Sequence, residues 1–122
     1  WIHFHRLPSN QSLAALYNQS KLFVTASDYE GWGLPGSEAM SCGAALVSTD
    51  SGGVRGYASS GTNSLLSIAG DMDALCHNIA KLLEDETLRV KIAKAGEQSI
   101  QLFSWDKAAK SFEQCLYKLI KD

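Results

Sequence analysis

The chain has 122 residues, a length that suits one domain. Apolar residues make up 45% of it and charged residues 20%, so the chain can bury a core, and the composition excludes a disordered protein. The net charge is −2 and there is no basic run, so neither nucleic acid nor an anionic membrane surface is an expected partner.

The three cysteines, Cys42, Cys76 and Cys115, are odd in number, widely spaced and set in helix-like contexts. These features predict reduced, buried thiols rather than disulfides. A metal site would need more closely spaced ligands, so no metal is expected.

The first residues, Trp1 to Arg6, alternate apolar Ile2 and Phe4 with His3 and His5, which predicts a strand with both histidines on one face. We interpret that face as partly exposed surface, because no third residue suggests a metal or catalytic role.

A helix and a buried strand are expected next. Pro8 and Ser9 offer a break and an N-cap, and a helical apolar stripe follows; its members are Leu13, Ala14, Leu16 and Tyr17. The nearly all-apolar run from Leu22 to Ala26 is typical of a parallel strand covered on both faces.

The stretch from Ser27 to Met40 reads as a Gly-rich turn leading into a helix, and two carboxylates with seven residues between them, Glu30 and Glu38, bracket the turn. Its glycines, Gly31, Gly33 and Gly36, permit positive φ or close approach to a ligand, and Pro35 suits a first helical turn. The free amides at the start of this helix form a ready site for phosphate. Many α/β domains have such a turn for packing reasons alone. The flanking acids indicate that sugar or ribose hydroxyls are held beside the phosphate.

A third strand is expected from Ala44 to Thr49, followed by a second Gly-rich connection from Asp50 to Gly56. Since ligands of open α/β sheets bind at the carboxyl ends of the strands, both turns belong on one rim and can face one ligand. A short fourth strand is expected from Ser64 to Ile68.

The rest of the chain is predicted to be helical, with Asp71, Asp85 and either Ser104 or Asp106 as N-caps. Apolar residues at helical spacing are interpreted as core; in the last helix they are Phe112, Cys115, Leu116, Leu119 and Ile120. The lysines of that helix, Lys107, Lys110, Lys118 and Lys121, are expected on its solvated face.

Taken together, these motifs resemble the C-terminal, nucleotide-sugar-binding half of the retaining glycosyltransferases of family 4, which have the two-domain GT-B fold. The resemblance runs from Leu13 to Leu66; it rests on Leu16-Tyr17, Phe23-Val24-Thr25-Ala26-Ser27, Glu30-Gly31-Trp32-Gly33-Leu34-Pro35 with Glu38-Ala39-Met40 (the E-x7-E motif), Gly43 with Leu46-Val47, and Gly52-Gly53. Phe103-Ser104-Trp105 is similar to the segment that leads to the family's C-terminal helix.

The fold that this resemblance implies is α/β: a truncated Rossmann-like domain of three layers, with a short parallel sheet of three to four strands flanked by helices, and C-terminal helices. Residues 1–122 would then be a single, partial nucleotide-sugar-binding domain without the N-terminal acceptor domain. The family's basic pair for the diphosphate would lie upstream of Trp1. We therefore expect this polypeptide alone to be inactive as a transferase.

The resemblance also assigns roles to residues. Glu30 would be the catalytic residue that contacts hydroxyls of the transferred sugar, Glu38 would accept hydrogen bonds from the ribose, and the backbone amides of Gly33 and Leu34 would bind the diphosphate or the sugar. Further substrate-binding residues would be Gly31, Trp32, Gly52 and Gly53. The family works without a bound metal, so no cofactor is expected.

The expected partners are a nucleotide sugar and, through the missing domain, a glycan or lipid-linked acceptor of polysaccharide or glycolipid synthesis. The expected location is cytoplasmic, with the full-length protein peripheral to the inner face of the membrane. Two alternatives stay open: a non-catalytic sugar-nucleotide-binding module, and an epimerase of the same overall fold.

The sequence departs from the family pattern at two positions. Gly56, next to Arg55, stands where an acidic residue is usual, and Arg6 stands where glycine is common. The chain would also begin at the third strand of the family's sheet. Its first segment, Trp1 to Arg6, is therefore expected either to pair directly with Leu22 to Ala26 or to be completed by another copy of the chain.

Overall fold

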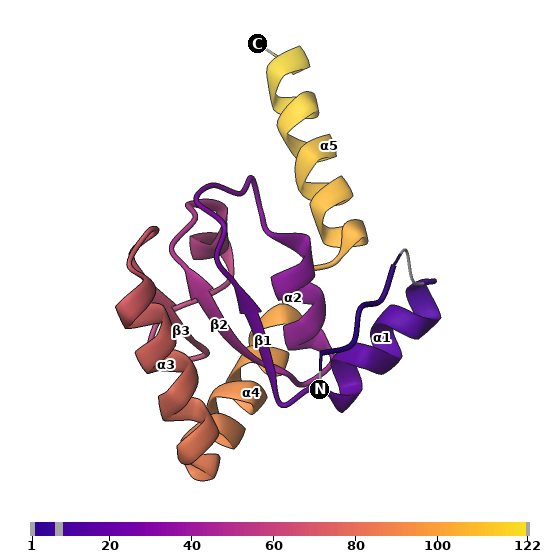
Figure 1. Cartoon of the computed structure of the whole chain (residues 1–122). Coiled ribbons are helices and arrows are strands. Elements are labelled where there is room, and N and C mark those ends of the chain that lie inside the picture. The colour runs from indigo at the N-terminus through magenta and orange to yellow at the C-terminus, as the bar shows by residue number, and fades with distance from the viewer. Residues whose placement is uncertain (1, 7–8, 122) are drawn as a thin grey trace.

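A computed structural model describes residues 2–6 and 9–121, with the side chain of residue 121 excepted, as three parallel strands with helices around them (Figure 1). The elements are α1 (Asn10–Gln19), β1 (Leu22–Thr25), α2 (Leu34–Ser41), β2 (Ala45–Thr49), the 3-10 helix η1 (Gly53–Gly56), β3 (Ser64–Ser67), α3 (Met72–Glu84), α4 (Glu86–Ile100) and α5 (Trp105–Lys121). The predicted α/β class and the short parallel sheet are confirmed.

The central strand of the sheet is β2, which pairs in parallel with β1 on one side and with β3 on the other. All five residues of β2 are buried. Ala45 and Val47 pack on one face with Leu82 of α3, whereas Leu46 packs on the other face with Met40 of α2. This arrangement gives the three layers expected from the sequence.

Local capping chemistry starts the helices where the sequence predicts. Ser9 caps α1, since its hydroxyl accepts a hydrogen bond from the Ser12 amide at 3.2 Å. Asp71 and Asp85 cap α3 and α4 through the Ala74 amide at 2.9 Å and the Leu88 amide at 2.8 Å. For α5, Ser104 rather than Asp106 provides the cap, because its hydroxyl accepts from the Lys107 amide at 3.2 Å.

The strand predicted from Trp1 to Arg6 is wrong in its described part, residues 2–6. These residues form no strand, and the side chains of Ile2, His3, Phe4 and His5 are exposed. Two alternating apolar residues do not make a strand without a neighbour that supplies hydrogen bonds and covers one face. The expected pairing with Leu22 to Ala26 is therefore absent, and completion by another copy of the chain stays a prediction. Trp1 lies outside the described residues.

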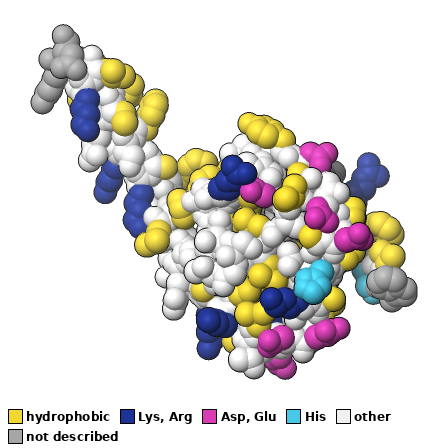
Figure 2. Space-filling view, turned by 90° about the vertical axis from the view of Figure 1, so that its left-hand side faces the viewer, with side chains coloured by type: hydrophobic (Ala, Val, Ile, Leu, Met, Phe, Trp, Pro, Cys, Tyr) yellow, Lys and Arg dark blue, Asp and Glu magenta, His cyan; other side chains and the backbone are white. Residues whose placement is uncertain are grey.

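The expectation that the apolar stripe of α5 is core is also wrong. Helix α5 extends away from the rest of the molecule (Figure 1), and every described side chain from residue 105 to 120 is exposed. Lysines and apolar side chains both lie along this arm in Figure 2. Lys107, Lys110 and Lys118 are exposed as predicted, whereas the side chain of Lys121 is outside the described part.

The cysteines are free, as predicted, but they are not buried. Cys42 is half-buried, and Cys76 and Cys115 are exposed. Cys76 and Cys115 lie in helices as expected, whereas Cys42 is the C-cap of α2. Which side of a helix meets the core depends on tertiary packing.

Candidate functional site

The two Gly-rich turns meet directly at the carboxyl ends of β1 and β2, which confirms that they share one rim. Glu30 forms an isolated parallel bridge with Gly52. Its amide donates to the Ser51 carbonyl at 2.9 Å, and its carbonyl accepts from the Gly53 amide at 3.0 Å. The backbone of Glu30 is thus held on both sides by the second turn.

This close approach depends on Gly53. A Cβ atom at this position would lie 2.5 Å from the Glu30 carbonyl oxygen and would also collide with the Gly31 carbonyl. Gly31 itself has open space where a Cβ would stand. Of the two glycines, only Gly53 is required by the contact between the turns.

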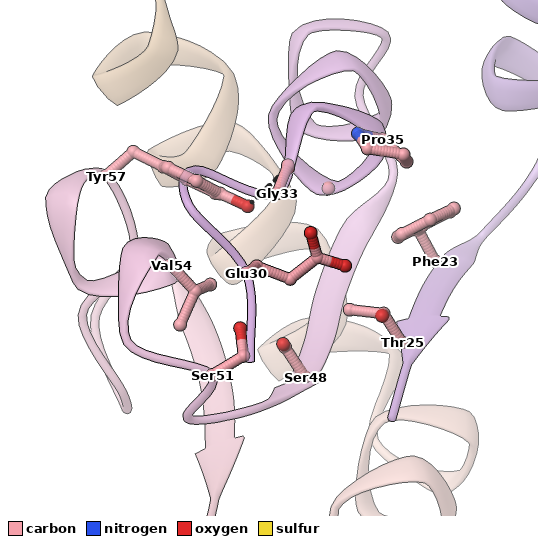
Figure 3. Close-up of a pocket in the computed structure, with 10 residues that line it drawn as sticks. Phe23, Thr25, Glu30, Gly33, Pro35, Ser48, Ser51, Val54 and Tyr57 are labelled. Atoms are coloured by element: carbon pink, nitrogen blue, oxygen red, sulfur yellow. Dashed lines mark hydrogen bonds between the residues drawn. The ribbon is translucent and has the colours of Figure 1, made fainter. Parts of the chain in front are cut away.

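The side chain of Glu30 points into a cavity at this rim, between the start of α2 and the β1 side chains Phe23 and Thr25 (Figure 3). The cavity has a volume of about 20 Å³. That space holds one water molecule or one hydroxyl group. The Ser27 hydroxyl donates a hydrogen bond to Oε1 of Glu30 at 2.8 Å.

The helix that faces this carboxylate begins without a side-chain cap. Gly33, the N-cap of α2, has φ of +80°, and Pro35 lies in the first turn as predicted. Within the described residues, the amides of Gly33 and Leu34 donate no hydrogen bond. The positive end of α2 therefore presents free donors, which suits an anion.

Tyr57 fixes the start of α2 by a hydrogen bond. Its hydroxyl donates to the Gly33 carbonyl at 2.8 Å and would lie 2.7 Å from a Cβ at Gly36. Burial, together with the negative charge of Glu30, raises the pKa of Tyr57 to about 12. The phenol is therefore a neutral, permanent donor beside the cavity at physiological pH.

Glu38 lies elsewhere. It is exposed on the face of α2 that carries Leu34 and Ser41, and this face lines a groove of about 850 Å³ against the start of α5. The residues that line the cavity around Glu30 do not include it. The structure thus brings Glu30, Gly33 and the second turn together. It places Glu38 about one helical turn beyond the start of α2, in the groove against α5.

Trp32 is half-buried, and its ring packs against Tyr57 and Phe103, each with a centroid distance of 5.1 Å. A Cβ at Gly56 would lie 2.7 Å from the Trp32 ring. Gly56, which stands where the family pattern has an acidic residue, therefore makes room for Trp32.

Arg55, the other residue at that departure, turns away to pair with Asp50. Its Nε donates to the two carboxylate oxygens at 2.7 and 2.9 Å. This hydrogen bond lowers the pKa of Asp50, although partial desolvation opposes it. Arg55 is largely exposed, so the pair is a surface contact.

The sequence-based site residues do not include Ser27, which hydrogen-bonds Glu30, or four polar residues that line the cavity, namely Thr25, Ser48, Ser51 and Tyr57. Ser27 and Ser51 each lie two residues past the end of a strand, so the strand-end rule that located the turns could have found them. Tyr57 had no local signal, because it reaches Gly33 across 24 positions of sequence.

In residues 2–6 and 9–121, no group of three or more His, Cys, Asp or Glu side chains could hold a metal ion. Over that same part of the chain, no helix has the length and apolarity to span a membrane.

Comparison with known proteins decides the family. A model described as "Glycosyl transferases group 1" matches residues 2–99. The chain belongs to this family. The coarse resemblance drawn from the sequence is thereby confirmed.

Individual proteins that are similar to this group 1 glycosyl transferase chain support the same family assignment. It is 32% identical over 106 residues to the O-antigen chain mannosyltransferase B of Escherichia coli, covering 87% of the chain but 27% of that relative. The sucrose-phosphate synthase of Thermosynechococcus elongatus has a similar structure, with a TM-score of 0.81 and 29% identity over 91% of this chain and 28% of that one. Anabaena Alr3699/HepE, solved in complex with UDP, gives a TM-score of 0.77 and 25% identity over 84% of this chain and 29% of that one. The chain thus spans roughly a quarter to a third of these proteins.

Proposed function

We propose that this chain is the donor-binding domain of a retaining glycosyltransferase of family 4, which moves a sugar from a nucleotide diphosphate to a glycan or glycolipid acceptor. One observation carries the proposal. The carboxylate of Glu30 and the uncapped start of α2 face the same cavity at the carboxyl rim of the sheet (Figure 3). An acceptor for sugar hydroxyls thus stands beside donors for a phosphate.

The arrangement fits the charge that develops during transfer. The bond between the anomeric carbon and a phosphate oxygen breaks, and the nucleoside diphosphate leaves with additional negative charge on that oxygen. The free amides of Gly33 and Leu34, with the α2 dipole behind them, would stabilise this charge without reorganising. Glu30 would orient the sugar by accepting hydrogen bonds from its hydroxyls.

The position of Glu38 supports a role at the ribose. It follows Leu34 by four residues on the same face of α2, which corresponds to about 6 Å along the helix axis. A ribose attached to a diphosphate at the helix start would come within reach of its carboxylate. The E-x7-E motif would then divide the donor between Glu30 at the sugar and Glu38 at the nucleoside.

Other parts of the proposal rest on the family and its members. UDP in the Alr3699/HepE structure supports a nucleotide partner, and the O-antigen mannosyltransferase supports a role in polysaccharide synthesis. Transfer without a bound metal, a cytoplasmic location and a peripheral membrane contact of the full-length protein are proposed from the resemblance.

Calorimetric titration of the chain with UDP, GDP, ADP and TDP tests the donor site. Glu38→Ala should weaken the nucleoside diphosphate that binds about tenfold to a hundredfold, as expected for lost hydrogen bonds to a charged group. Glu97→Ala, at an exposed glutamate of α4, is the matched control and should bind like the parent chain. Equal affinity of Glu38→Ala and the parent would contradict the ribose role, and no binding of any of the four would contradict the donor site.

A further inference from the structure

The side chains of Thr25, Ser27 and Glu30 form a row connected by hydrogen bonds at the rim. Of the three, only Glu30 is a site residue predicted from the sequence. The Ser27 hydroxyl lies 2.8 Å from Oε1 of Glu30, and the Thr25 hydroxyl lies 3.3 Å from that of Ser27. Thr25 and Glu30 both line the cavity, as Figure 3 shows. Ser27 lies between them in the row of hydrogen bonds.

The direction of these hydrogen bonds follows from the protons available. An ionised carboxylate only accepts, so the single proton of the Ser27 hydroxyl is donated to Glu30. Ser27 can then only accept from Thr25, whose own proton completes the row. The hydrogen bond to the charged group is the stronger of the two.

The backbones of Ser27 and Glu30 are fixed independently of this row. The Thr49 hydroxyl donates to the Ser27 carbonyl at 2.6 Å, and Ser51 and Gly53 hold the backbone of Glu30. The main freedom left is in the glutamate side chain, whose several rotamers would scatter the carboxylate over the rim.

We propose that Ser27 is a positioning residue: its hydroxyl holds Oε1 of Glu30 so that Oε2 is directed at a hydroxyl of the donor sugar, and Thr25 supports Ser27 in this role. The inference deepens the proposed function and rests on it. A pre-oriented carboxylate loses less freedom when the sugar binds, so the hydroxyl of Ser27 strengthens a contact that it does not itself make.

The test measures how much the sugar adds to nucleotide binding. Affinities of the chain for UDP and UDP-glucose, and for GDP and GDP-mannose, give the ratio between each pair. Ser27→Ala should lower this ratio about threefold to tenfold, the range of one ordinary hydrogen bond, and leave the affinity for the nucleoside diphosphate unchanged. Ser27→Thr, which keeps the hydroxyl, should restore the ratio. Ser59→Ala, at an exposed serine outside the cavity, is the matched control.

Glu30→Ala distinguishes a failure of the positioning role from a failure of the proposed function. If Glu30→Ala abolishes the sugar contribution and Ser27→Ala leaves it intact, the positioning role is wrong while the proposed function stands. If Glu30→Ala leaves the ratio unchanged, or if none of UDP, GDP, ADP and TDP binds the parent chain, the proposed function and the positioning role fail together.

A measurement without ligand distinguishes positioning from a purely structural hydrogen bond. Three-bond NMR couplings across χ1 of Glu30 should report one rotamer in the parent chain and an average of several in Ser27→Ala. The backbone amide shifts of the turn should stay in place, because Thr49, Ser51 and Gly53 still hold it. A single unchanged Glu30 rotamer in Ser27→Ala would overturn the inference.

Discussion

At the scale of single residues, the site depends on a few atoms that the sequence cannot rank. Gly31 and Gly53 look equivalent in the chain, each part of a Gly-rich turn after a strand. In the structure Gly53 lies against the carbonyls of Glu30 and Gly31, whereas a Cβ on Gly31 would meet nothing. Their sensitivity to substitution should therefore differ.

Gly53→Ala should lower the free energy of unfolding by about 1–3 kcal/mol, the usual cost of forcing atoms into a packed site. Gly31→Ala, the matched control in the facing turn, should change it by less than about 1 kcal/mol. Urea unfolding followed by circular dichroism measures both. Equal effects of the two substitutions would show that the turns do not touch as described.

Tyr57 should give the chain a distinct alkaline dependence of stability. Its pKa is about 12 in the folded protein, against an ordinary value of 10.0. Below pH 10 the phenol is neutral in both states. Between about pH 10 and 12 only the unfolded chain loses the proton, so stability falls as the pH rises, with a limiting slope of about 1.4 kcal/mol per pH unit.

Tyr57→Phe removes this contribution. At pH 8 the variant should be less stable than the parent by about 1 kcal/mol, because the hydrogen bond to Gly33 is lost. The difference should shrink as the pH rises above 10, since only the parent loses stability through this group. Urea midpoints of both chains from pH 8 to 11 measure it; a constant difference would contradict the raised pKa.

At the scale of elements, α3 and α5 show how one type of pattern leads to two environments. Both carry apolar residues at helical spacing, and this spacing predicts that both stripes belong to the core. Leu82 of α3 is fully buried against the sheet, whereas Leu119 of α5 is 75% exposed. Amphipathic spacing predicts that a helix has an apolar side, but not that this chain covers it.

Substitution of these two leucines should separate the elements. Leu82→Ala should cost about 2–5 kcal/mol, as for other buried leucines. Leu119→Ala should change the free energy of unfolding by less than about 0.5 kcal/mol, as for exposed positions. Thermal and urea unfolding of the two variants measure the contrast. A large cost at Leu119 would mean that α5 packs on the body of the protein in solution.

At the scale of the whole molecule, the sheet is a three-stranded core with β1 and β3 as its outer strands in the described part of the chain. Residues 2–6 do not extend it. Self-association through the β1 edge therefore stays a prediction, and sedimentation equilibrium of the chain tests it. At the carboxyl ends of the strands, by contrast, the two Gly-rich turns are joined to each other within the chain by backbone hydrogen bonds.

The sequence by itself determined the α/β class, the three parallel strands, the caps at Ser9, Asp71 and Asp85, and the common rim of the two turns. These features follow from hydrophobic period and from side chains that act on their own neighbours in the chain. The tertiary structure alone decided the hydrogen bond from Tyr57 to Gly33, the need for glycine at position 53, the separation of Glu38 from the Glu30 cavity and the exposure of α5. Each of these depends on atoms that approach through space from distant positions in the chain, and local patterns carry no information on such contacts.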